Sequence, residues 1–350
     1  MKESPVRFST LSKSVLVTGL LAVSAAAFAQ KTQLLVYTAL ETDQVKAYQE
    51  GFNKVYPDIE IKWVRDSTGV ITAKLLAEKS NPQADVVMGV AASSLALMDK
   101  QGMLEPYAPL NLDAIMSQYR DKKKVPAWWG MDVWGATVCF NTVEAQKKNI
   151  PKPESWQDLT KPAYKGQIVM PNPASSGTGY FDVVAWLTLF GDQAGKGGGW
   201  KFMDGLHDNI AQYTHSGSKP CNMAASGEFV VGISFEYRAN ANKAKGAPID
   251  LIFPKEGLGW DLEAFAIHKG TKKLDAAKKL ADWASSKDAM LLYGKNFAIT
   301  AQPGVAAPLA NVPKDYEQRL VKLDFNYAAE QRERILAEWN KRYNAKSEKR

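Results

Sequence analysis

The sequence is constrained most by a regular alternation of short apolar strands and amphipathic helices that begins near residue 33. In the helix expected over residues 43–55, Val45, Tyr48 and Phe52 recur at the spacing of one helix face. Strand–helix–strand series of this kind build parallel sheets covered by helices. The first series comprises strands at 33–37, 59–64 and 84–88 and helices at 43–55, 70–78 and 93–100.

A second series of strands and helices follows residue 134, with strands expected at 138–140, 167–170, 209–213, 230–235, 251–253 and 263–267. The chain is longer than one core usually requires, and no Gly/Ser linker divides it. We therefore predict an α/β fold of two discontinuous lobes joined by crossing strands. The expected parts are residues 31–127 plus 263–308 for lobe 1, residues 128–262 for lobe 2, and C-terminal helices in 309–350 that contact both lobes.

The first 29 residues have the features of a secretory signal peptide. Lys2, Arg7 and Lys13 precede an apolar stretch at 15–27, and Ala27-Phe28-Ala29 matches an A-x-A cleavage pattern. The apolar stretch is shorter than the roughly 20 residues that a membrane span requires, and no Cys follows it as a lipid attachment point. We expect cleavage near Ala29 and export of the mature chain.

Charge and composition exclude several classes of function. Removing three basic residues and one acidic residue with the leader lowers the formal net charge from +7 to +5, without the clustered basic face that nucleic-acid binding requires. The His residues are scattered and the two Cys have no ligand spacing, so we expect no metal site. Cys139 and Cys221 could form a disulfide in an exported chain, but the sequence leaves open whether they meet.

The segment Met170–Tyr180, with the sequence MPNPASSGTGY, joins an expected strand to an expected helix through a tight loop. Its hydroxyl groups and the unpaired N–H groups of the first helical turn lie at the positive end of the helix dipole. This arrangement suits an oxyanion such as phosphate, phosphonate, sulfate or carboxylate. The alternative is an ordinary Ser/Thr helix N-cap. The candidate anion-binding residues here are Ser175, Ser176, Gly177 and Thr178.

Further polar and aromatic residues lie where expected strands end. Ligands of open α/β sheets bind outside the carboxyl ends of the strands, and two lobes with facing strand ends form a cleft that can close. The candidates found by this rule are Thr38, Ser67, Thr68, Glu236, Tyr237, Trp260, Asp261 and Glu263.

The mature chain resembles the periplasmic substrate-binding proteins of ABC importers, a superfamily that includes ferric-ion-binding and hexose-phosphate-binding proteins. The segments VYTALETDQ, PNPASSGT and ASGEFVVGISFEY carry this resemblance. Ferric-binding members end the last segment in a Tyr pair, whereas here Arg238 follows Tyr237, which counts against iron. The resemblance implies a two-lobed type II fold with a hinge and a ligand cleft. It also implies a periplasmic monomer that needs no cofactor, catalyses no reaction and delivers its ligand to a membrane permease.

Three further segments resemble the 2-aminoethylphosphonate-binding proteins more closely: THSGSKPCNMAASGE, ISFEYRA and IDLIFPKEGLGWDLEAFAI. A phosphonate requires hydrogen-bond donors, whereas an ammonium group requires carboxylates and an aromatic face. For the phosphonate we expect contacts from Thr38, Ser67, Thr68, Ser175, Ser176, Gly177, Thr178 and Tyr237. For the ammonium group we expect contacts from Glu236, Trp260, Asp261 and Glu263.

Other functions stay open at this point. The chain could bind ferric iron with a synergistic anion, a phosphate ester such as a sugar phosphate, or a polyamine. An exported hydrolase is a further alternative, supported by the Ser-rich loop and the carboxylates. Against an enzyme, the sequence contains no G-x-S-x-G segment and no His at a plausible spacing from a nucleophile.

Overall fold

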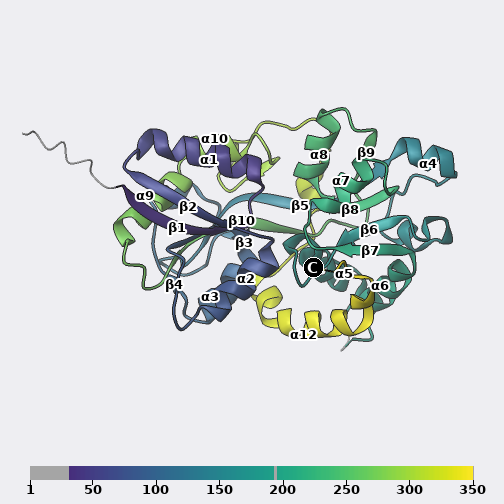
Figure 1. Cartoon of the computed structure of the whole chain (residues 1–350), viewed down its shortest axis with the longest axis horizontal. Helices are drawn as coiled ribbons and strands as arrows, with labels where there is room; N and C mark the ends of the chain where they lie inside the picture. The colour runs from purple at the N-terminus through teal and green to yellow at the C-terminus, as the bar shows by residue number, and fades with distance from the viewer. Residues whose placement is uncertain (1–30, 193–194, 350) are drawn as a thin grey trace, which may run out of the picture. The chain divides into compact units, whose positions relative to one another are not determined.

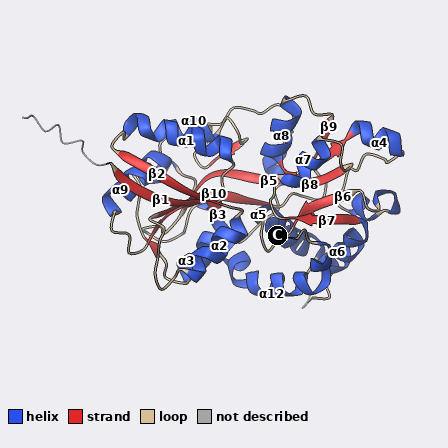
Figure 2. Cartoon of the chain, viewed as in Figure 1, coloured by secondary structure: helices blue, strands red, loops and turns tan. Residues whose placement is uncertain are grey.

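A computed structural model describes residues 31–192 and 195–349 (Figure 1), and the expected signal peptide, 1–29, lies outside these residues. The strands and helices alternate along the chain as the sequence predicts (Figure 2). The first series comprises β1 (Thr32–Thr38), α1 (Thr42–Val55), β2 (Ile59–Arg65), α2 (Thr68–Ala77), β3 (Val86–Ala91), α3 (Ala92–Lys100) and β4 (Leu104–Glu105).

The second series begins with a strand much longer than predicted. It comprises β5 (Trp129–Asn141), α4 (Thr142–Lys148), β6 (Ile168–Pro171), α5 (Gly177–Phe190), α6 (Gly198–Asn209), β7 (Ile210–Thr214), α7 (Lys219–Ala225), β8 (Val231–Phe235), α8 (Glu236–Ala244) and β9 (Ile249–Ile252). The remaining elements are β10 (Trp260–His268), α9 (Leu274–Ala284), α10 (Lys287–Tyr293), β11 (Ile299–Thr300), α11 (Tyr316–Arg319) and α12 (Phe325–Tyr343).

Strand β5 belongs to two sheets, because it exchanges partners halfway along its length. Residues 129–135 pair antiparallel with β10, whereas residues 136–140 pair antiparallel with β8. The backbone N–H of Ala136 donates to the carbonyl of Gly259 where the partners change. The strand order is therefore β2-β1-β3-β10-β5-β8-β6-β7, with the first sheet before β5 and the second after it.

The first sheet is mixed rather than wholly parallel. Strand β1 pairs in parallel with β2 and β3, as the strand–helix alternation predicts, but β10 returns antiparallel between β3 and β5. Figure 1 shows α1 and α10 on one side of this sheet and α2 and α3 on the other. In the second sheet, β6 pairs in parallel with β7 and β8.

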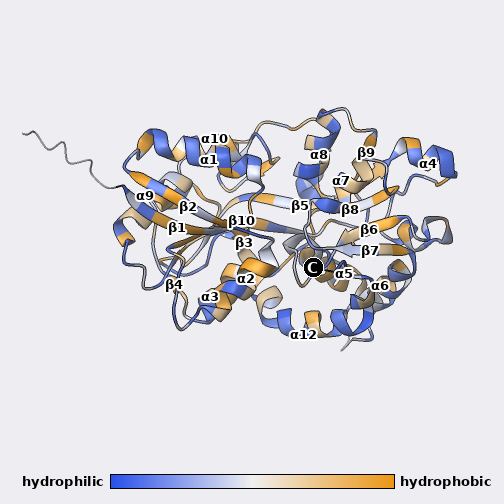
Figure 3. Cartoon of the chain, viewed as in Figure 1, coloured by the Kyte–Doolittle hydropathy of each residue, from blue (hydrophilic) through white to orange (hydrophobic). Residues whose placement is uncertain are grey.

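The apolar side chains form two large buried clusters, one for each sheet, and Figure 3 shows hydrophobic residues in the strands and also in helices such as α3 and α12. The first cluster includes Met131, Val133 and Leu262, whereas Trp134 and Leu258 belong to the second. The change of cluster thus lies a few residues from the predicted lobe boundaries at 127/128 and 262/263, which stay a prediction.

Helix α12 contacts elements of both sheets. It lies against α3, and Lys100 of α3 forms an ion pair with Glu330. Farther along, the ring of Trp339 lies 4.8 Å from that of Tyr213 in β7. In the described part of the chain, no helix combines the length and apolar character needed to cross a membrane.

Candidate functional site

A small cavity of about 50 Å³ lies where strand ends of the two sheets meet. The first sheet contributes residues at the ends of β1, β2 and β3 or just after them, and the second contributes residues just after β6 and β7 and at the end of β8. Six of the twelve predicted site residues line this cavity: Ser67, Thr68, Ser176, Gly177, Thr178 and Glu263. Nine others complete it, namely Ala39, Glu41, Arg65, Gly89, Ala91, Trp134, Ser216, Gly217 and Phe235.

The N-termini of two helices, α2 beside the first sheet and α5 beside the second, meet at the cavity from opposite sides. Their approach is so close that a Cβ added to Gly177 would lie 2.8 Å from Oγ1 of Thr68. The Ser176 hydroxyl accepts a hydrogen bond from the N–H of Gly179, so this residue is a helix N-cap and also lines the cavity. Hydroxyls from both sheets and the first-turn N–H groups of α5 thus converge on one small volume.

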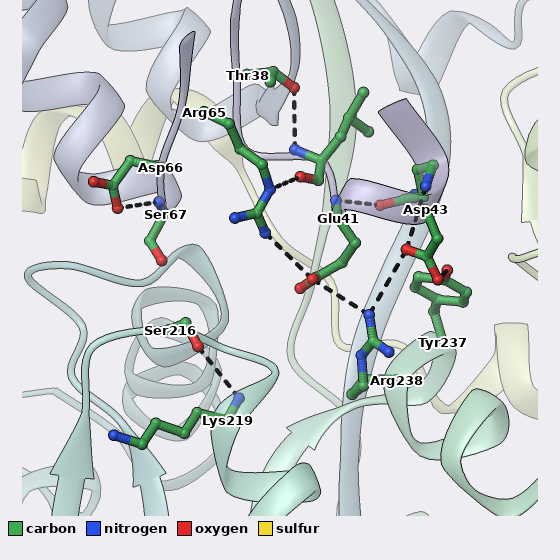
Figure 4. Close-up of polar contacts among 12 residues, drawn as sticks. Thr38, Glu41, Asp43, Arg65, Asp66, Ser67, Ser216, Lys219, Tyr237 and Arg238 are labelled. Carbon is green, nitrogen blue, oxygen red and sulfur yellow. Dashed lines mark hydrogen bonds and ion pairs between the residues drawn. The ribbon is translucent and has the colours of Figure 1, made fainter. Parts of the chain in front are cut away.

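Arg65 places a guanidinium at the same cavity, and Figure 4 shows it extending toward Glu41. Its terminal nitrogen lies 3.2 Å from the Glu41 carboxylate, and Arg238 of α8 approaches the same carboxylate at 3.3 Å. Sequence reasoning missed Arg65 and Glu41. The strand-end rule that identified Ser67 also covers Arg65, the last residue of β2, and could have found it.

Glu263 provides a carboxyl group on the wall of the cavity. It is 9% exposed, and the Gln44 amide donates to its two oxygens at 3.3 and 3.2 Å. Burial is the main cause that raises the pKa of Glu263, and the nearby Glu236 carboxylate raises it further. This carboxyl group therefore resists ionisation.

Trp134 forms an aromatic part of the wall. Its ring contacts those of Phe181 and Phe235 at centroid separations of 4.7 and 5.9 Å. The indole Nε1 is buried, and none of the described residues accepts a hydrogen bond from it. A buried donor of this kind is normally satisfied, so it favours an acceptor within the site.

Three residues predicted for the phosphonate lie near the cavity without lining it. The Thr38 hydroxyl accepts from the N–H of Leu40, and the Ser175 hydroxyl donates to the carbonyl of His215. The Tyr237 hydroxyl donates to Asp43 at 2.7 Å (Figure 4). In the structure these side chains therefore form hydrogen bonds within the protein, and their part in ligand binding stays a prediction.

Three residues predicted for the ammonium group also lie apart from the cavity lining. Glu236 is fully buried and accepts from the N–H of Gly135 at 2.8 Å. Asp261 accepts from the N–H of Leu262 at 2.7 Å, and its pKa is raised to about 6 by burial. Trp260 lines a separate groove and donates from Nε1 to the carbonyl of Val321. Asp261 and Glu263 are two residues apart on β10 and point to the same face, but only Glu263 lines the cavity, whereas Asp261 accepts hydrogen bonds from the backbone N–H groups of Ser93 and Leu262.

Several contacts join the strand ends of the two sheets across the cavity. The N–H of Gly69 donates to the carbonyl of Ser175 at 2.9 Å, and the His215 Nε2 lies 3.0 Å from an oxygen of Asp66. The Tyr237–Asp43 and Arg238–Glu41 contacts described above also join the two sides of the cavity, at the start of α1. The cavity is small because these contacts hold its two walls together.

Cys139 and Cys221 form a disulfide, which answers the question that the sequence left open. It links β5 to α7, and the loop before α7 supplies Ser216 and Gly217 to the cavity. Among the described residues, no group of three or more His, Cys, Asp or Glu side chains is arranged to hold a metal ion.

Comparison with known proteins assigns the chain to a family. Residues 81–331 match the model of the bacterial extracellular solute-binding proteins. The chain is 32% identical to an uncharacterised protein of Haemophilus influenzae, over 95% of this chain and 98% of that protein. It is 29% identical to a probable ABC transporter periplasmic-binding protein of Sinorhizobium fredii, over 76% of each.

The solved structure of the periplasmic binding protein AfuA from Actinobacillus pleuropneumoniae, with fructose-6-phosphate bound, superposes with a TM-score of 0.83. The two sequences are 31% identical, and the match covers 90% of this chain and 99% of that chain. The predicted fold class is thereby confirmed. The chain belongs to the bacterial extracellular solute-binding protein family, whose members are binding proteins, and it has the two-lobed type II fold of periplasmic binding proteins.

Proposed function

We propose that this chain is the periplasmic component of an ABC importer that binds 2-aminoethylphosphonate in the cavity between the strand ends. The monomeric protein then delivers its ligand to a membrane permease. The observation that carries the proposal is the convergence of hydroxyl groups from both sheets on one cavity that also contains a cation, a carboxyl group and an indole. In a zwitterionic phosphonate, the phosphonate group would contact the hydroxyl groups and the cation, and the ammonium group would contact the carboxyl group and the indole.

The anion end is assigned to Arg65 and the hydroxyl groups beside the two helix N-termini. A phosphonate dianion has three oxygens, which suits donors such as Ser67, Thr68 and Thr178 placed on opposite walls. Hydrogen bonds to a charged partner contribute roughly 1.5–3 kcal/mol each. A few of them reach the ~8 kcal/mol of micromolar binding after the ordering cost is subtracted.

The ammonium end is assigned to Glu263 rather than to Asp261, because Glu263 lines the cavity. The Trp134 face on the same wall offers a cation–π contact. Ferric iron is disfavoured, because Arg238 stands where the family resemblance places the second Tyr of ferric-binding members, and the Tyr237 hydroxyl donates to Asp43.

A hexose phosphate is the second candidate, because fructose-6-phosphate is bound in the AfuA structure, which is 31% identical in sequence. Calorimetry of the ligand-free mature protein distinguishes the two candidates. We expect 2-aminoethylphosphonate to bind with micromolar or tighter affinity, and ethylphosphonate, inorganic phosphate and fructose-6-phosphate to bind at least about tenfold more weakly. Tighter binding of fructose-6-phosphate would overturn the proposal in favour of the sugar phosphate.

Arg65→Met removes the cation at the anion end while preserving most of the side-chain length. We expect it to weaken 2-aminoethylphosphonate binding roughly 10- to 100-fold, the equivalent of one charge-assisted hydrogen bond. Lys62→Met is the matched control, because it removes a positive charge from the same strand at a side chain that is 53% exposed. Equal affinities for the two variants in calorimetry would remove Arg65 from the anion site.

Glu263→Gln preserves the shape of the side chain and removes its ability to carry a negative charge. We expect this variant to bind 2-aminoethylphosphonate about tenfold more weakly and to bind ethylphosphonate as the parent protein does. The ratio of the two affinities is the measurement. Asp261→Asn is the comparison, and a greater loss of amine selectivity in that variant would return the ammonium assignment to Asp261.

A further inference from the structure

The carboxyl group of a second residue, Asp132, lies directly behind that of Glu263. Glu263 of β10 and Asp132 of β5 are opposite each other in the antiparallel register, so their side chains emerge on the same face of the sheet. Glu263 lines the cavity, whereas Asp132 does not and is completely buried. The pair therefore links the ligand cavity to the interior of the first sheet.

Asp132 is surrounded by groups that disfavour a negative charge. Neither of its carboxyl oxygens receives a hydrogen bond from a donor among the described residues. The ionisable groups that act on the pair come from α1, α8 and α10, and they are carboxyl groups or phenols: Glu41, Tyr48, Glu236, Tyr237 and Tyr293. Two ionised carboxylates in this position would be buried and would repel each other without compensation.

A proton on Asp132 resolves this conflict, because its O–H can then donate to Glu263. Burial first, and then the charges of Glu263 and Glu236, raise the pKa of Asp132 well above its usual range. The two carboxyl groups interact too closely to titrate independently, so protons are gained and lost by the pair as a unit. The carboxyl groups of Asp132 and Glu263 can thus hold a proton between them at the wall of the cavity.

We propose that Asp132 and Glu263 form a proton-sharing carboxyl pair that selects the amine of the ligand by releasing a proton when the ammonium group binds. The inference rests on the proposed function and deepens it, since it concerns the same cavity. The proton passes to solvent and the ligand cation takes its place, so the charge beside Trp134 is conserved. Asp132 is a positioning residue, because it acts on the ligand through Glu263.

The first test needs no ligand and measures melting temperature against pH with Asp132→Asn. A raised folded-state pKa means that the folded protein holds more protons than the unfolded chain above about pH 4. The contribution of the carboxyl pair to the free energy of unfolding therefore falls as pH rises above that value. Because Asn cannot bind this proton, stability should fall less steeply with pH in Asp132→Asn. We expect the melting temperature of the variant minus that of the parent to increase from pH 5 to pH 8.

The second test measures proton release by calorimetry at pH 7.5 in two buffers of different ionisation enthalpy. We expect the parent to release about 0.3–1 proton per 2-aminoethylphosphonate bound, and Asp132→Asn to release less than half of the parent value. Ethylphosphonate provides the matched ligand without an amine, and any proton that its phosphonate group releases should be the same in the parent and in Asp132→Asn. Asp182→Asn is the control variant, because Asp182 is equally buried and unpartnered among the described residues but lies in α5 and is not paired with Glu263.

The outcomes separate the inference from the proposed function. Binding of 2-aminoethylphosphonate without proton release, or with release unchanged in Asp132→Asn, overturns the inference and leaves the ligand assignment intact. A pH-independent difference in melting temperature also overturns it. Absence of 2-aminoethylphosphonate binding to the parent overturns the ligand assignment, and the selection mechanism with it. Proton release that is lost in Asp132→Asn and retained in Asp182→Asn supports the inference.

Discussion

Gly69→Ala is expected to abolish tight ligand binding without destabilising the protein. A Cβ at this position would lie 2.1 Å from the carbonyl oxygen of Ala174, on the opposite side of the cavity. The clash is with backbone atoms that cannot rotate away, and it would also disrupt the hydrogen bond from the Gly69 N–H to Ser175. A variant that rarely reaches the closed arrangement loses affinity in proportion, and we expect a loss of roughly 100-fold or more.

Calorimetry measures this loss, and small-angle scattering should show no contraction when ligand is added. The melting temperature of the ligand-free variant should be unchanged or slightly higher, because Ala is favoured over Gly within a helix by about 1 kcal/mol. Gly205→Ala in α6 is the matched control, since its added Cβ meets only the Thr160 side chain at an ordinary 3.5 Å. Parent-like affinity in Gly69→Ala would show that ligand binding does not require this approach of the two walls.

Removing the disulfide is expected to have the largest effect on stability. Cys139 and Cys221 are separated by 82 residues in sequence, and a cross-link over a loop of this length stabilises the folded state by roughly 4 kcal/mol in the chain-entropy description. The double variant Cys139→Ala/Cys221→Ala should therefore unfold at a clearly lower denaturant concentration. Ligand affinity should change much less, because neither Cys lines the cavity.

The single variant Cys139→Ala and the chemically reduced parent protein are the controls. The single variant loses the cross-link and one buried sulfur, whereas the reduced parent loses only the cross-link. Similar losses in all three samples assign the effect to the bridge. A loss below about 1 kcal/mol in the reduced parent would mean that packing around α7, rather than chain entropy, determines the stability of this region.

The strands and helices could be predicted from sequence because their signals are local. Helix α1 displays its apolar residues at helical spacing, and α5 begins at a loop of small hydroxyl residues. The strand-end rule identified Ser67 and Thr68, and the loop before α5 identified Thr178, and all three line the cavity. Each of these inferences depends on residues within one turn or one strand of each other.

Strand β5 shows where local signals were insufficient. Residues 138–140 were predicted as a strand, whereas the strand extends over Trp129–Asn141. Its first half includes Gly130, Asp132 and Gly135, which weaken strand propensity and mask the pattern. The pairing of this half with β10 decides its structure, because the two neighbouring strands are buried together at the junction of the two sheets.

By itself, the sequence determined the order of strands and helices, and the strand ends at which a binding site could form. Both follow from the periodicity and the turn residues of short segments. Only the tertiary structure decided that Arg65 and Glu263 line the cavity while Asp261 accepts hydrogen bonds from the backbone. It likewise decided that the two Cys residues pair and which carboxyl groups become neighbours. These relations depend on register and side-chain direction between segments far apart in the chain, which no local pattern encodes.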